Sequence, residues 1–179
     1  MSLVTFDFSK VNPSVHRAMV LHMIAHGYKL EEPLSIPSLY DFNIPESATI
    51  NSIRDNIPMS GFCRDNLTDD NFSRLVPITR GIQVCGFYDM KDSFSSQEAV
   101  GVINKLSQQT GRDFRVGAPL EALSFWLSNR SNCPRWFTVL GKVYKGKVLH
   151  WNHDLLEFHL GDWDSGWCSF RQVFIVEDL

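Results

Sequence analysis

Two neighbouring segments near the middle of the chain have the clearest helical spacing of hydrophobic and polar residues. In residues 96–110 the hydrophobic positions recur every three or four residues, which predicts an amphipathic helix with one buried side. Ser95 and Glu98 have the spacing of a capping box at its start, and Gly111 is the expected residue at its end. The predicted buried positions are Ala99, Val102, Ile103 and Leu106.

A second helix is predicted after a short extended link at residues 113–116. Pro119 suits the first helical position, because that position has no intrahelical hydrogen bond for a proline to remove. Leucines then repeat on one face of this helix, with a tryptophan beside them. The two helices should therefore form a scaffold for the rest of the domain.

The remaining segments are predicted to include one more helix, a loop region and several β-strands. Near the N-terminus, Asn12 and Pro13 predict the start of a helix that ends at Gly27. The proline-rich residues 31–60 are predicted to be mainly loop with short helical turns. Runs rich in β-branched and aromatic residues predict strands at residues 4–8, 75–88, 136–141, 147–151 and 170–177.

A polar and aromatic segment, residues 151–167, separates the last two predicted strands, and we expect it to form a long structured loop. Loops on a rigid scaffold commonly carry binding residues, and tryptophan faces can stack on a ligand or a partner side chain. The alternative is that these tryptophans pack the loop onto the sheet. The predicted ligand-binding residues are Trp151, Asp162, Trp163, Asp164 and Trp167.

The same region holds the densest group of residues able to bind a metal ion. Imidazole and carboxylate ligands together suit zinc or iron, and carboxylates alone suit calcium. A polar loop with ordinary hydrogen-bonded histidines is the alternative interpretation. The predicted metal ligands are His150, His153 and His159, together with Asp162 or Asp164.

The composition is that of an ordinary globular protein. Of the 179 residues, 44% are hydrophobic and 21% are charged, which supports a hydrophobic core and excludes wholesale disorder. Residues 1–90 contain 7 basic and 10 acidic side chains, and residues 91–179 contain 10 of each. Neither half has the basic excess that binding to a phosphate backbone requires, so a general nucleic-acid role is excluded.

The cysteines and the N-terminus bear on the expected location. No apolar run approaches the roughly 18–20 residues of a membrane helix, and the first residues do not resemble a secretory signal. We therefore expect a cytoplasmic protein with reduced thiols, and two disulfides in a secreted protein are the alternative. The cysteines, which form no CxxC motif, are Cys63, Cys85, Cys133 and Cys168.

The two-helix segment and the C-terminal strand resemble a known family. Residues 106–116 (LSQQTGRDFRV) and Glu121 resemble the formylglycine-generating enzyme (sulfatase-modifying factor) family, and Phe170-Arg171-Gln172-Val173 resembles its closing strand. The resemblance implies a C-type-lectin-like fold. Family enzymes of this type bind copper through two close cysteines near the C-terminus, where this chain has only Cys168. The resemblance therefore extends to the fold and not to the enzymatic activity.

Together these observations predict an α+β, C-type-lectin-like domain at residues 76–179, made of two helices and a twisted antiparallel sheet with long loops. Residues 1–75 would form an N-terminal helical and loop extension packed on the main domain. The first functional hypothesis is a non-enzymatic binding protein, with a protein or a small polar ligand as partner, that uses the loop at 151–167. The second is a metal-dependent enzyme that uses the three histidines with an aspartate and a divalent ion. The sequence requires no cofactor and does not indicate an oligomeric state.

Overall fold

The computed structural model describes residues 22, 34–72 and 80–178. The chain divides into two compact units, Met1–Ser35 and Ile36–Leu179, and the second unit contains all the elements below. The predicted strand at residues 4–8, the helix predicted to end at Gly27 (apart from His22) and residues 75–79 lie outside the described residues. No helix among the described residues is long and apolar enough to cross a membrane.

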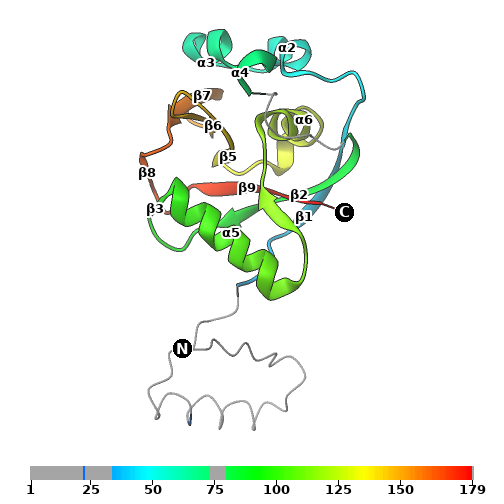
Figure 1. The fold of residues 1–179 in the computed structure, drawn as a ribbon. Helices are drawn as coiled ribbons and strands as arrows, with labels where there is room; N and C mark the ends of the chain where they lie inside the picture. The colour runs from blue at the N-terminus through cyan, green and yellow to red at the C-terminus, as the bar shows by residue number, and fades with distance from the viewer. Residues whose placement is uncertain (1–21, 23–33, 73–79, 179) are drawn as a thin grey trace. The chain divides into compact units, whose positions relative to one another are not determined.

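The fold class is α+β, as predicted, with one mostly antiparallel sheet and few helices (Figure 1). The strands are β1 (Leu39–Ile44), β2 (Gly81–Asp89), β3 (Phe94–Ser95), β4 (Phe114–Val116), β5 (Trp136–Tyr144), β6 (Lys147–Asn152), β7 (Glu157–Asp162), β8 (Gly166–Trp167) and β9 (Gln172–Glu177). The helices are α2 (Ile50–Ile53), η2 (Arg54–Asn56), α3 (Gly61–Asn66), α4 (Asp69–Phe72), α5 (Ser96–Thr110), α6 (Pro119–Asn129) and η3 (Arg130–Asn132).

Seven of the described strands form the main sheet, in the order β1-β2-β9-β5-β6-β7, with β4 paired to β9. The neighbours are antiparallel except for β5 and β9, which run parallel at the centre. A small second sheet joins β3 to β8. The C-terminal strand therefore lies between β2 and β5, and it brings residues near 170 beside residues near 137 and 150.

Both predicted central helices are confirmed, together with their end signals. Ser95 and Glu98 form the capping box of α5, and Gly111 ends the helix with φ of 66°, a left-handed conformation that glycine adopts without strain. Pro119 is the first residue of α6. The predicted strands at 136–141, 147–151 and 170–177 correspond to β5, β6 and β9.

The sheet is covered on both faces. Successive strand residues point to opposite faces, and all four residues from Val173 to Val176 in β9 are fully buried. Phe174 and Val176 belong to the main hydrophobic cluster together with residues of α6, and the Phe174 ring lies 6.1 Å from that of Phe125 in α6. The buried stripe of α5 lies outside that cluster, which is consistent with α5 covering the other face (Figure 1).

The predicted boundary at residue 75 differs from the observed division. β1 was predicted as loop, but it pairs antiparallel with β2, with Tyr40 opposite Cys85, and so belongs to the main sheet. Phe42 and Ile44 alternate with polar residues in β1 and are buried in the core. Residues 36–72 are therefore part of the main unit and not of a separate extension.

Candidate functional site: a cluster of histidine, arginine and tryptophan

The predicted loop at residues 151–167 is wrong: the segment forms the end of β6, the whole of β7 and the short strand β8. Trp151 is only 3% exposed, and its ring lies 5.4 Å from that of Trp126 and 5.0 Å from that of Phe158. Trp151 alternates with His150 and Asn152 along β6, so its side chain points to the face of the sheet that α6 covers. It is therefore part of the core. Trp151 is therefore not available to a ligand.

The predicted aspartates and His153 lie apart from one another. Asp162, at the end of β7, forms an ion pair of 2.6 Å with Lys147. His153 lies exposed in the turn between β6 and β7, and its backbone N–H donates to the carbonyl of Arg135. Asp164 is exposed in the turn before β8, and Trp163 is half-buried there. Within the described ranges no three histidine, cysteine or acidic side chains are placed to hold a metal ion, so the predicted metal set does not converge.

Two of the predicted histidines do come together. The strand register places Val173 opposite Thr138, Thr138 opposite His150, and His150 opposite His159. Directly opposed residues share one face of a sheet, so these four side chains form a row across β9, β5, β6 and β7. The imidazoles of His150 and His159 stack with their centroids 5.6 Å apart and their planes 17° apart.

Trp167 covers the middle of this row. Its ring is 6% exposed and lies 5.7 Å from the His150 ring. The indole N–H donates to Ser96 Oγ at 2.8 Å, and Ser96 Oγ donates in turn to the carbonyl of Trp163 at 2.7 Å. A Cβ at Gly161 would lie 3.0 Å from the Trp167 ring, so a side chain here would press on the ring, and glycine allows the close approach.

Arg171, which precedes β9, completes the cluster. Its Nη1 lies 2.9 Å from Nδ1 of His150, and its guanidinium carbon lies 5.1 Å from the centroid of the Trp167 ring. A guanidinium can only donate hydrogen bonds, so Nδ1 of His150 must accept. His150 is therefore the neutral tautomer that carries its proton on Nε2.

The electrostatics of the cluster agree with this assignment. Burial, with the nearby Arg171 cation as the next cause, lowers the pKa of His150 from 6.5 to about 3. Burial also lowers the pKa of Arg171, since desolvation disfavours its cation. The cluster thus pairs an imidazole that stays neutral near pH 7 with a partly desolvated positive charge.

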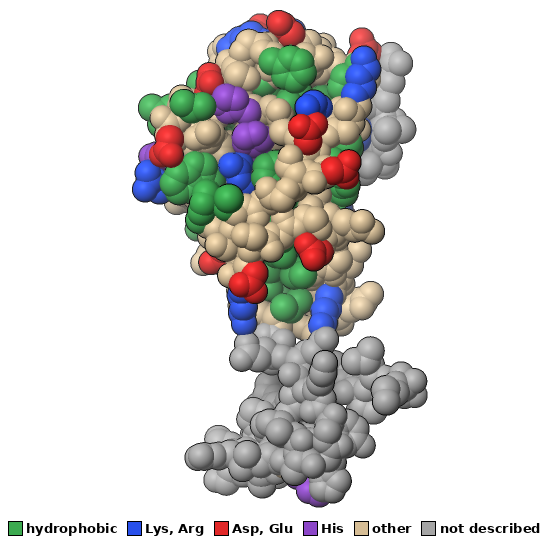
Figure 2. Space-filling model, turned by 90° about the vertical axis from the view of Figure 1, so that its left-hand side faces the viewer, with side chains coloured by type: hydrophobic (Ala, Val, Ile, Leu, Met, Phe, Trp, Pro, Cys, Tyr) green, Lys and Arg blue, Asp and Glu red, His purple; other side chains and the backbone are tan. Residues whose placement is uncertain are grey.

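Two buried polar atoms in the row have no hydrogen-bond partner: Thr138 Oγ1 and His159 Nε2. Glu157 Oε1 lies 3.1 Å from His159 Nε2, at ion-pair distance but without a hydrogen bond. Buried polar groups are nearly always hydrogen-bonded in folded proteins, so these two atoms remain available for a hydrogen bond. Figure 2 shows histidine side chains gathered beside a basic one and among hydrophobic ones, on the side of the molecule where β6, β7 and β8 lie.

The cluster thus differs from the predicted site in its membership. It contains the predicted His150, His159 and Trp167, and adds Ser96, Thr138 and Arg171. Arg171 had a signal in the sequence, because it is the arginine of the segment Phe170 to Val173 that resembles a family's closing strand. Its position beside His150 depends on the pairing of β9 with β5 and could not be seen locally.

Comparison with known proteins gives no further assignment: no protein family, no curated protein and no solved structure matches the chain.

Proposed function

We propose that this chain is a non-enzymatic binding protein that recognises an anionic group, a carboxylate or a phosphate, through Arg171 and His150. The single observation that carries the proposal is the state of Arg171. Its guanidinium is half-buried, stacked on Trp167 and bonded to a neutral imidazole. It has no carboxylate within ion-pair distance among the described residues.

Other arginines of the same unit show how this one differs. Arg112 is paired with Glu177, and Arg115 is paired with both Glu121 and Asp178. Arg135, like Arg171, lies over a tryptophan ring, at 4.7 Å, but it also pairs with Asp154 at 3.2 Å. A partly desolvated cation without a counter-ion is costly, so an external anion would stabilise Arg171 more than any of these.

The donors around Arg171 suit a group with two or three acceptor oxygens. Arginine presents a planar fork of N–H donors that matches carboxylate and phosphate oxygens. One nitrogen of the fork is used by His150 Nδ1, which leaves the remaining donors for a ligand. The same bond fixes a second donor, the Nε2–H of His150, beside Gly161. Because His150 stays neutral, the charge offered to a ligand near it comes from Arg171.

We also propose that the domain is C-type-lectin-like. Three features support this: two helices joined by a short extended link, the strands that follow them, and a closing strand led by Phe170 and Arg171. In this architecture the two helices and the sheet would form the scaffold, and the surface between β6 and β9 would carry recognition. The metal-dependent alternative has no support from the positions of His153, Asp162 and Asp164.

The proposal is tested by isothermal titration of the whole chain with sodium phosphate and, separately, with sodium acetate. At least one anion should bind, and Arg171→Gln should weaken that binding at least tenfold, because a charge-assisted hydrogen bond contributes about 1.5–3 kcal/mol. Arg135→Gln is the matched control, since it also removes an arginine stacked on a tryptophan. Equal binding by wild type and Arg171→Gln, or no binding of either anion by the wild type, would overturn the proposal.

A further inference from the structure

A pocket lies on the opposite face of the sheet from the histidine and arginine cluster. Its volume is about 300 Å³, and it opens between the start of β1, the C-terminal part of β2, the start of β9 and the segment that joins η3 to β5. Gln172 of this pocket and Arg171 of the cluster are successive residues. Since Val173 belongs to the histidine row, the alternation along β9 directs Gln172 to the α6 face.

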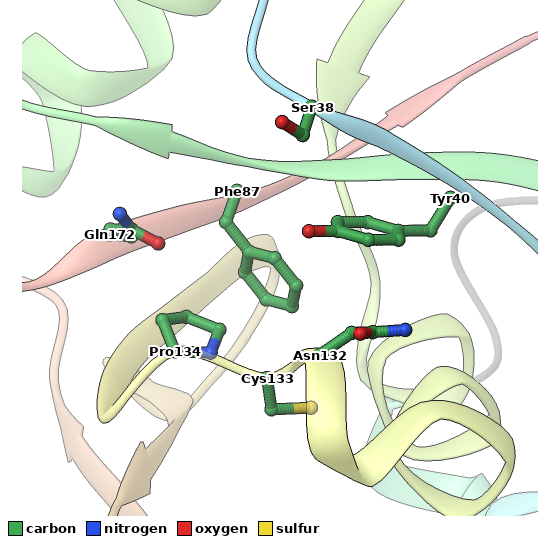
Figure 3. A pocket seen from close by; sticks show the side chains of 7 residues that line it. All are labelled: Ser38, Tyr40, Phe87, Asn132, Cys133, Pro134 and Gln172. Atoms are coloured by element: carbon green, nitrogen blue, oxygen red, sulfur yellow. The ribbon is translucent and has the colours of Figure 1, made fainter.

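Aromatic rings held by the core form one wall of the pocket. Figure 3 shows the rings of Phe87 and Tyr40 side by side, with the segment from Asn132 to Pro134 across from them and Gln172 at the end nearest Phe87. The Phe87 ring packs within 5.5 Å of three other phenylalanine rings, and the Tyr40 ring lies 5.8 Å from that of Phe125. The apolar wall is therefore fixed before any ligand arrives.

Glycine at position 86 brings β1 close enough to close the pocket. A Cβ at Gly86 would lie 2.9 Å from the carbonyl oxygen of Ser38 and 3.0 Å from the Leu39 side chain. Contacts this short are not tolerated by larger residues, so only glycine allows the start of β1 to cross β2 here. The position of Ser38 at the rim depends on this crossing.

The lining is uncharged but rich in unused hydrogen-bonding groups. Burial raises the pKa of the Cys133 thiol to about 12, so it stays neutral, and no acidic or basic side chain lines the pocket. The polar side chains of the lining make no hydrogen bond to any other group in the part of the chain that the structure describes. They are the hydroxyls of Ser38 and Tyr40 and the carboxamides of Asn132 and Gln172.

We propose that this pocket binds a small, flat, uncharged heteroaromatic ring with donors and acceptors on its edge, of the chemical class of a purine base. Aromatic side chains stack on the faces of bases, and a carboxamide supplies one donor and one acceptor to a base edge, as asparagine and glutamine do to adenine. The volume lies at the lower end of the range for small-molecule sites, which suits one base and not a larger ligand.

The proposal goes beyond the anion site, because an uncharged ligand gains nothing from Arg171. Adenosine is the probe, since it is neutral, and methyl glucoside serves as an uncharged, non-aromatic comparison. Binding is followed by NMR at the side-chain amide signals of Asn132 and Gln172. Adenosine should shift both signals, and methyl glucoside should shift neither.

Variants make the test specific. Gln172→Leu and Tyr40→Phe should each weaken adenosine binding about tenfold, the loss expected for one hydrogen bond left unmade in a buried site. Gln108→Leu, on the exposed side of α5, should leave it unchanged. Arg171→Gln should also leave it unchanged, so failure of the anion proposal and failure of this one are separable. Absence of adenosine binding, equal binding of methyl glucoside, or binding insensitive to both pocket variants would overturn the inference. If Gln172→Leu does not fold, Tyr40→Phe, which removes one hydroxyl, decides alone.

Discussion

The pair Arg115 and Glu121 gives the sharpest prediction about stability. Glu121 is fully buried at the start of α6, and its oxygens accept from Arg115 at 2.6 and 3.0 Å and from the backbone N–H of Ala118 at 2.7 Å. Glu121→Gln removes the charge while keeping the shape. It leaves the Arg115 cation without its most buried partner, and only Asp178 remains.

The expected cost follows from the burial of the two partners. Breaking a buried ion pair by neutralising one member costs about 3–5 kcal/mol. The lower end applies, because the Arg115 side chain is 26% exposed and keeps Asp178. We therefore expect Glu121→Gln to lower the free energy of unfolding by about 3 kcal/mol, which corresponds to a fall in Tm of roughly 10 °C for a domain of this size.

Urea denaturation followed by tryptophan fluorescence measures this change. All five tryptophans lie after residue 125, so the signal reports on the second unit alone. Glu98→Gln is the matched control, because Glu98 occupies the same position of the capping box in α5 but is exposed. The control should change stability much less. If Glu121→Gln unfolds at the wild-type urea concentration, or if the two variants cost the same, the buried pair is not the stabilising element proposed.

Three further predictions follow from other parts of the structure. Burial lowers the pKa of His150 from 6.5 to about 3 in the native state. Between these pH values the native state therefore binds fewer protons than the unfolded state, so stability should fall as the pH drops from about 6.5 towards 3. His150→Gln should flatten that dependence in urea unfolding at several pH values, and an unchanged slope would contradict it. Gly117→Ala should strongly destabilise the fold, since the new Cβ would lie 2.3 Å from the Phe174 ring. Gly101→Ala should instead stabilise the fold by up to about 1 kcal/mol, because Gly101 lies in α5 and its new Cβ would meet no atom within 4 Å beyond the helix's own backbone. Thermal unfolding of both variants decides this, and a shift of the same sign in both would refute it. Iodoacetamide should modify the exposed Cys168 first, because burial raises the pKa of the other three cysteines. Mass spectrometry of the modified peptides measures the order of modification, and modification of another cysteine before Cys168 would contradict the prediction.

The sequence predicted the elements whose signals are local. The capping box at Ser95, the glycine stop at Gly111 and the proline start at Pro119 are each contained in a few residues, and all three are confirmed. The strands after residue 135 were found because β-branched and aromatic residues dominate them.

The strand β7 was missed although its residues alternate. Glu157 to Leu160 reads polar, apolar, polar, apolar, but it contains no β-branched residue and is followed by Gly161. Glycine normally weakens a strand. Here glycine leaves room for the Trp167 ring, which would lie 3.0 Å from a Cβ at this position, and that contact comes from outside the segment.

The site was partly predictable for the same reason. His150 and His159 were identified as residue types with chemistry, but their stacking depends on a hairpin that was predicted as a loop. Arg171 reaches His150 only because β9 enters the sheet between β2 and β5. Such contacts depend on the order of strands in the sheet, which cannot be read from a single sequence.

The tautomer of His150 and its response to an anion test the central claim most directly. In a ¹⁵N NMR spectrum of the histidine side chains, assigned with His150→Gln, His150 should carry its proton on Nε2 at pH 7. Added sodium phosphate or sodium acetate should shift this Nε2–H signal in the wild type and not in Arg171→Gln. A proton on Nδ1, or a signal that neither anion moves, would contradict the account of Arg171 and His150 as an anion-binding pair.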